Sequence, residues 1–152
     1  MGKAYGYIRV MPKRMDMEAQ AVTLHEMGVM DRDIFIDFID GVGNNGDACP
    51  QYERLLKKLR DKDLLYLQSL DMLGDGYAEI GRQWRRLTKE KKADVVVLDM
   101  PALDTRRGRT QFGTLVGDVV LSMLEYASDA EWAMRKEKQR AGIEKAKNRG
   151  VQ

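Results

Sequence analysis

The fold is decided by the stretch Ala4-Tyr-Gly-Tyr-Ile-Arg-Val-Met-Pro-Lys-Arg-Met-Asp-Met-Glu-Ala-Gln20. It opens with a run of aromatic and β-branched residues that favours a buried strand, and Pro12 ends that run. The residues from Asp16 onward have the composition of a helix start. A strand that leads directly into a helix is the building unit of open α/β sheets, in which ligands bind at the carboxyl ends of the strands. The residues that follow Val10 are therefore expected to lie at a functional edge.

Strand-like and helix-like segments alternate through most of the remaining chain. Gly28 is suited to end the first helix, and Pro50 is suited to the first turn of the second. The expected helices cover residues 17–27, 50–60 and 77–91, and the further strands cover 33–38, 63–70 and 93–98. This alternation predicts an α/β fold, with a mostly parallel sheet flanked by helices and right-handed crossovers.

The last third of the chain has the pattern of one long helix. Apolar residues recur at i, i+3 and i+4 from Phe112 to Met134, and nothing strongly breaks the helix before about Arg149. At 1.5 Å per residue it would be roughly 50 Å long. We expect residues 1–111 to form the α/β body and residues 112–152 a long helix of the same domain. Its apolar stripe exceeds what one small body can cover, which indicates a homo-oligomer built on this helix.

The charge of the chain is unevenly distributed. The formal net charge is +2, but residues 135–152 hold seven Lys and Arg against two Glu, or +5, which leaves −3 for the rest. A basic end on an acidic body favours contact with a polyanion such as DNA. A solvated, lysine-rich helix terminus is the alternative interpretation, since cations also suit the carboxyl end of a helix.

Composition excludes several other classes of protein. No apolar run approaches the roughly 20 residues that span a bilayer, so no membrane association is expected. Cys49 is the only cysteine, which rules out an internal disulfide and fits a cytoplasmic location. His25 is the only histidine and cannot build a histidine-rich metal site. We expect neither a metal nor a cofactor.

The opening strand resembles the start of the serine recombinase family, the resolvases and DNA invertases, whose pattern runs Y-x-R-V-S-T-x-x-Q. Tyr7, Arg9 and Val10 match this pattern, but Met11 stands where the family has its nucleophilic serine. The resemblance extends over nearly the whole chain, through the segments 34–37, 50–59, 63–66, 69–74, 98–105, 131–143 and 146–151. It implies a resolvase catalytic-domain fold followed by a dimerisation helix. It also implies site-specific DNA recombination, in which the serine attacks a phosphodiester.

The resemblance also implies which residues form the site. Residues retained at family positions are Tyr7, Arg9, Gln20, Asp37, Lys58, Asp71 and Glu131. Family arginines are replaced by Cys49, Met72, Asp75 and Trp132. A thioether has no proton to lose, and phosphoryl transfer needs both a nucleophile and cationic donors around the phosphate. We therefore expect a catalytically inactive recombinase-like domain.

Other activities are expected to survive. The predicted partners are a second copy of the chain, an active recombinase relative in mixed assembly, and DNA. DNA binding is expected to be weak and to use the basic end of the long helix, through Arg135, Lys136, Lys138, Arg140, Lys145 and Lys147.

Two alternatives remain open. One is an active recombinase with Cys49 or Ser69 as substitute nucleophile. The other is a flavodoxin-like module that binds a small anion in the loop Gly41–Gly46, although a glycine-rich loop alone is a weak signal.

Overall fold

The computed structural model describes residues 2–10, 17–39, 49–111 and 113–150. Four strands form one parallel sheet in the order β2-β1-β3-β4. These strands are β1 (Ala4–Val10), β2 (Ile34–Phe38), β3 (Leu64–Leu67) and β4 (Asp94–Val97). The opening strand lies in the interior of the sheet, which explains why five successive residues of it are buried. The predicted parallel sheet flanked by helices is confirmed.

The third strand is shorter than the sequence pattern predicts. After Leu67 the chain leaves the sheet and forms a 3₁₀ turn, η3 (Leu70–Leu73). The turn buries Met72 and Leu73, while the Ser69 hydroxyl donates to the Asp71 carboxylate. The expected strand 63–70 was therefore too long, because apolar residues that fill a turn have the same pattern as those of a buried strand.

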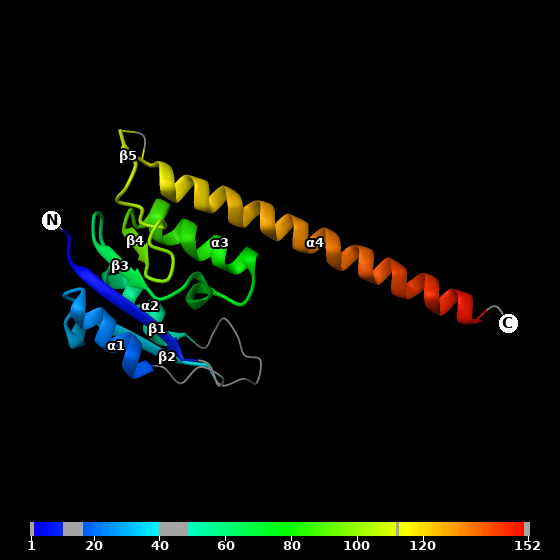
Figure 1. The fold of residues 1–152 in the computed structure, drawn as a ribbon, viewed down its shortest axis with the longest axis horizontal. Helices are drawn as coiled ribbons and strands as arrows, with labels where there is room; N and C mark the ends of the chain where they lie inside the picture. Colours follow the sequence, from blue (N-terminus) through cyan, green and yellow to red (C-terminus); the bar gives the residue numbers. More distant parts are fainter. Residues whose placement is uncertain (1, 11–16, 40–48, 112, 151–152) are drawn as a thin grey trace.

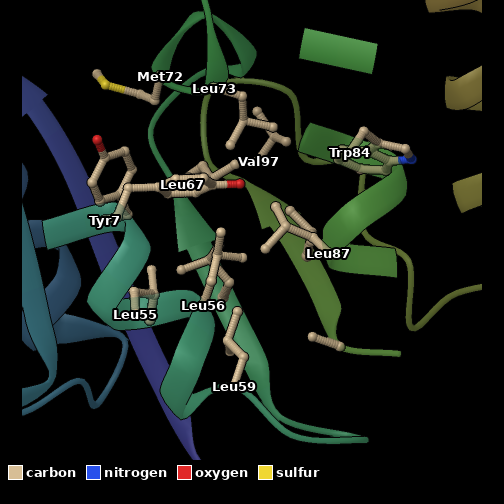
Figure 2. Packing of buried hydrophobic residues seen from close by; sticks show 14 of the residues in the cluster. Tyr7, Leu55, Leu56, Leu59, Leu67, Met72, Leu73, Trp84, Leu87 and Val97 are labelled. Carbon is tan, nitrogen blue, oxygen red and sulfur yellow. The ribbon is translucent and has the colours of Figure 1, made fainter. Parts of the chain in front are cut away.

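The helices cover both faces of the sheet. The helix α1 (Met17–Glu26) packs on the face that presents Ile8, Tyr66 and Val96. On the other face lie α2 (Pro50–Lys58) and α3 (Tyr77–Arg85), the latter continuing as a π-helical turn, η4 (Arg86–Glu90). Figure 2 shows this second core, which the leucines of α2, Leu67 of β3 and Trp84 of α3 all join. Pro50 occupies the first turn of its helix, as predicted.

The long helix is present, and a small hairpin precedes it. The hairpin pairs β5 (Arg109–Thr110) with β6 (Gly113–Thr114), and the sequence pattern did not predict these two short strands. The helix α4 (Leu115–Gly150) has 36 residues. Its first half packs on α3, where the Trp84 indole N–H donates to the Gly117 carbonyl at 2.9 Å, and its second half projects beyond the body (Figure 1). No helix in the described part of the chain is long and apolar enough to cross a membrane.

The apolar stripe of α4 divides into two faces. Val120, Leu121 and Leu124 are buried against the body. A second set of apolar side chains is exposed, and we call it the outer stripe: Leu115, Val119, Met123, Tyr126 and Met134. The sequence pattern did not separate these faces, because both recur with the period of the same helix.

Candidate functional site

Three side chains retained from the recombinase pattern meet at the carboxyl edge of the sheet. Tyr7 and Arg9 point to the same face of β1 because they are two residues apart. Asp37 is the register partner of Arg9 on β2. The Tyr7 hydroxyl donates to Asp37 Oδ2 at 2.8 Å, and Arg9 Nε donates to the Tyr7 oxygen at 3.1 Å. All three side chains are buried, so the network is shielded from solvent.

Asp37 also fixes the start of α2. Its Oδ1 accepts the amide N–H of Gln51 at 3.0 Å, and its Oδ2 accepts that of Tyr52 at 2.9 Å. A carboxylate at a helix N-terminus satisfies amide donors that have no partner within the helix. Asp37 therefore joins β1, β2 and α2 at one point. The Tyr52 ring packs on that of Tyr7, with 5.1 Å between the centroids.

Cys49 lies at the N-cap position of α2, beside this network, and is partly buried. Burial raises the pKa of the Cys49 thiol, the Arg9 guanidinium opposes that effect, and the carboxylates of Asp37 and Asp75 add to it. The net direction is upward, so the thiol stays protonated near neutral pH. A protonated thiol is a poor nucleophile.

The other replaced positions differ in their surroundings. Met72 is fully buried in the core, and its sulfur accepts the backbone N–H of Arg9 at 3.3 Å. An arginine at position 72 in that orientation would bury a guanidinium. Asp75 is exposed on the turn before α3, close enough to Cys49 to raise the pKa of its thiol.

One further carboxylate was not found from the sequence. Glu79, in the first turn of α3, is near enough to Arg9 for that guanidinium to help lower its pKa. Burial acts to raise the pKa of Glu79, but hydrogen bonds from Gln83 and Arg82 outweigh it. In the sequence, Glu79 appears only as an acidic residue near the start of a predicted helix. Acidic residues are common there because they stabilise the amino end of a helix, so the sequence alone did not mark Glu79 as a site residue.

Several expected site residues do not join this cluster. Lys58 is exposed at the opposite end of α2, roughly 12 Å along the helix from the Asp37 cap, with its ammonium 5.6 Å from the Phe35 ring centroid. Gln20 is buried on α1, the helix on the other face of the sheet. Asp71 accepts the Ser69 hydroxyl in η3. Met11 and the loop Gly41–Gly46 lie outside the described residues.

The remaining expected residues lie on α4 between residues 131 and 147. Glu131 accepts a hydrogen bond from Arg135 at 2.8 Å, and the Lys136 ammonium lies 5.4 Å from the centroid of the Trp132 ring. All six expected DNA-binding cations are exposed: Arg135, Lys136, Lys138, Arg140, Lys145 and Lys147. Among the residues with defined positions, no group of three potential metal ligands comes together.

Comparison with known proteins agrees with this architecture. The family model described as the resolvase N-terminal domain matches residues 4–152. The chain belongs to this family. The resolvase-family domain also resembles the crystal structure of the N-terminal catalytic domain of TP901-1 integrase, with a TM-score of 0.60 and 19% sequence identity. That match covers 87% of this chain and 98% of the integrase domain. At this level of sequence identity, it shows that the two domains share a fold and nothing further.

Proposed function

We propose that this resolvase-family domain is a site-specific recombinase-like module that does not cleave DNA. In this proposal it associates with copies of itself through α4, and it binds the DNA backbone weakly through the basic half of that helix. The observation that carries the proposal is Met11, which stands at the position of the nucleophilic serine. A thioether can neither lose a proton nor form a phosphoester, so the step that begins recombination has no nucleophile.

The charges around Arg9 support the same conclusion. A phosphodiester in transfer needs cationic donors around its non-bridging oxygens. Arg9 instead donates to Tyr7, its charge already interacts with the carboxylates of Asp37 and Glu79, and Asp75 adds negative charge beside the neighbouring Cys49. Loss of one oriented donor typically costs about 2.7–4 kcal/mol of transition-state stabilisation. Such losses need not add, but several together leave no useful rate.

The alternative of a substitute nucleophile finds little support. The pKa of Cys49 is shifted upward by burial, which is the opposite of activation. Ser69 donates its hydroxyl to Asp71, which could accept its proton, but the arginine donors that a phosphate needs are still replaced at Cys49, Met72, Asp75 and Trp132.

The outer stripe supports self-association. It places large apolar side chains on the side of α4 that faces away from the body, and exposed apolar area of this kind usually marks an interface. An interface built on the same helix would also permit mixed assembly with an active family member, whose activity this domain would then modulate.

The cleavage test uses a supercoiled plasmid that carries the DNA flanking the gene. After incubation and denaturation with detergent, a gel should show neither nicked or linear plasmid nor protein linked to DNA. The Met11→Ser variant should behave in the same way, since the phosphate-facing arginines are still missing. An active resolvase on its own plasmid is the positive control. A covalent adduct with the unmodified protein would refute the proposal, and cleavage by Met11→Ser would show that the missing arginines are dispensable.

A further inference from the structure

The two tryptophans of the chain have opposite environments. Trp84 is completely buried, and its indole N–H is bonded to the α4 backbone. Trp132 has 60% of its surface exposed, although it is a large aromatic residue on a regular helix. An exposed tryptophan is unusual enough to indicate a binding surface, because tryptophan is enriched where proteins make contacts.

The position of Trp132 on α4 explains why the body does not cover it. It follows Leu121 by 11 residues, or about three turns, and so lies on the side that faces α3. The groove between α3 and α4 ends at Ser128 and Asp129, beside Tyr77, where α3 begins. Trp132 lies one turn beyond that end of the groove. The carboxyl-terminal part of α4 projects from the body (Figure 1).

Self-association along the outer stripe would also leave Trp132 uncovered. Trp132 precedes Met134 of that stripe by two residues, which on a helix separates the two side chains by roughly 160°. A second copy packed on the outer stripe would therefore contact the opposite side of α4. A partner that covers Trp132 would therefore have to differ from a second copy packed on the outer stripe.

The charges around Trp132 identify the chemistry of that contact. The Lys136 ammonium lies over the indole face, 5.4 Å from the ring centroid. Between residues 131 and 147 there are six cations and three glutamates, which gives +3, and the six cations are exposed. An aromatic face beside exposed cations suits a polyanion that also offers flat apolar surface, and duplex DNA has both properties.

We propose that Trp132 and Lys136 together form a two-part contact to duplex DNA, which rests on the DNA binding proposed above. Lys136 contacts a phosphate, and the indole packs against the deoxyribose and base edges beside it. The cation–π contact holds the lysine side chain next to the ring before DNA arrives, so less side-chain freedom is lost on binding. The indole adds an apolar part to the affinity, and that part does not depend on counterion release.

The two parts of the contact can be separated by salt dependence. Affinity for a random-sequence duplex is measured by fluorescence anisotropy at several salt concentrations. Trp132→Ala should weaken binding by about tenfold at every salt concentration without changing the log–log slope, since the ring neutralises no phosphate. Lys136→Gln should make the slope shallower by about 0.9. Trp132→Phe, which keeps an aromatic ring, should lose less affinity than Trp132→Ala, and Val22→Ala, an exposed apolar truncation on α1, should lose none.

Tryptophan emission supplies a second measurement on the same samples. Because Trp84 is buried, a change on adding DNA should come from Trp132 and be absent in Trp132→Ala. Equal affinity of Trp132→Ala and wild type at every salt concentration would overturn this inference and leave the proposed function intact. No binding by wild type at low salt would overturn both. A change in emission with protein concentration alone would show that a second copy covers the ring, which also overturns the inference.

Discussion

Asp37 is the residue on which the geometry of the site depends. Its carboxylate accepts from the Tyr7 hydroxyl and from two amides of α2, and thereby holds three elements together. The retention of this carboxylate does not require retained chemistry, because its hydrogen bonds to Tyr7 and to the α2 amides are sufficient to explain it. The resolvase-family pattern at Tyr7, Arg9 and Asp37 therefore has a structural explanation even where the nucleophile is lost.

Asp37→Ala should lower the free energy of unfolding by about 2–4 kcal/mol. The loss of a helix cap accounts for about 1 kcal/mol, and a buried Tyr7 hydroxyl left without its acceptor accounts for about 1–3 kcal/mol. Urea denaturation followed by circular dichroism measures the change. Asp75→Ala, at an exposed carboxylate of the same cluster, should stay within about 0.5 kcal/mol of wild type. Equal stability of Asp37→Ala and wild type would contradict the structural role.

Cys49 allows a test of the electrostatics at the site. The rate of alkylation by iodoacetamide follows the thiolate fraction, so its pH dependence should give a pKa above the ordinary value of about 8.5. The pKa of Cys49 is raised because burial disfavours the thiolate, and this effect outweighs the opposing charge of Arg9. Asp75→Asn removes a nearby negative charge and should bring the pKa of Cys49 down. A pKa below the ordinary value in wild type would identify an activated thiol and revive the substitute-nucleophile alternative.

The helix α4 has two apolar faces with different tasks. The inner face secures the helix to α3, where Val120 is only 4% exposed, while Met123 on the outer stripe is 64% exposed. A substitution at Val120, which the sequence pattern would suggest as a probe of the oligomer, therefore tests the fold of one protomer instead. The interface is probed by residues of the outer stripe.

Met123→Glu should shift the protein toward monomer while the thermal midpoint of its body changes little. Its charge would be buried and unpaired in an interface, but solvated on a free helix. Sedimentation velocity at tens of micromolar measures the shift. Val22→Glu, the same kind of change at an exposed position on α1, should leave the assembly unaltered. Val120→Asp should lower the free energy of unfolding by about 3 kcal/mol or more, because it buries a carboxylate in the core. A wild-type protein that sediments as a monomer would contradict self-association.

The distribution of charge over the whole molecule determines how DNA binding should respond to salt. The body carries the acidic excess, and the exposed cations lie on the half of α4 that projects from it (Figure 1). Lysine and arginine contacts of this kind go mainly to phosphates, which position a protein without reading sequence. Binding should therefore be weak, indifferent to sequence and steep in salt.

If about four phosphates are neutralised per protomer, the log–log salt slope should be roughly −3.6. The triple variant Arg135→Ala, Lys138→Ala and Arg140→Ala should make this slope shallower by up to about 2.7, because three cations are removed. Because Arg135 is already paired with Glu131, its removal should change the slope by less than a full ~0.9, and the total change should fall below about 2.7. Anisotropy on random duplexes measures the slope, and an unchanged urea midpoint shows that the body is intact. A slope that the triple variant leaves unaltered would exclude this helix as the DNA contact.

The sequence by itself determined the main strands and helices and the layers of the fold, but not the β5–β6 hairpin or the η3 turn. Strands such as β1 and β4 are buried runs, and α2, α3 and α4 follow the helical period, because both patterns arise from neighbours along the chain. Alternation of the two then restricts the sheet to parallel pairing with helices on both faces. The resolvase-family residues at Tyr7, Arg9 and Asp37 could likewise be selected, because their spacing matches a motif.

Only the tertiary structure decided which surfaces meet. It placed Val120 inside and Met123 outside, ended β3 at Leu67, and turned the Met72 sulfur toward the Arg9 amide. It also brought Glu79 close to Arg9, although 70 residues separate them in the chain. These outcomes depend on the order of strands in the sheet and on the packing of α3 beneath α4. Both are set by contacts between distant segments, and no local pattern of residues encodes such contacts.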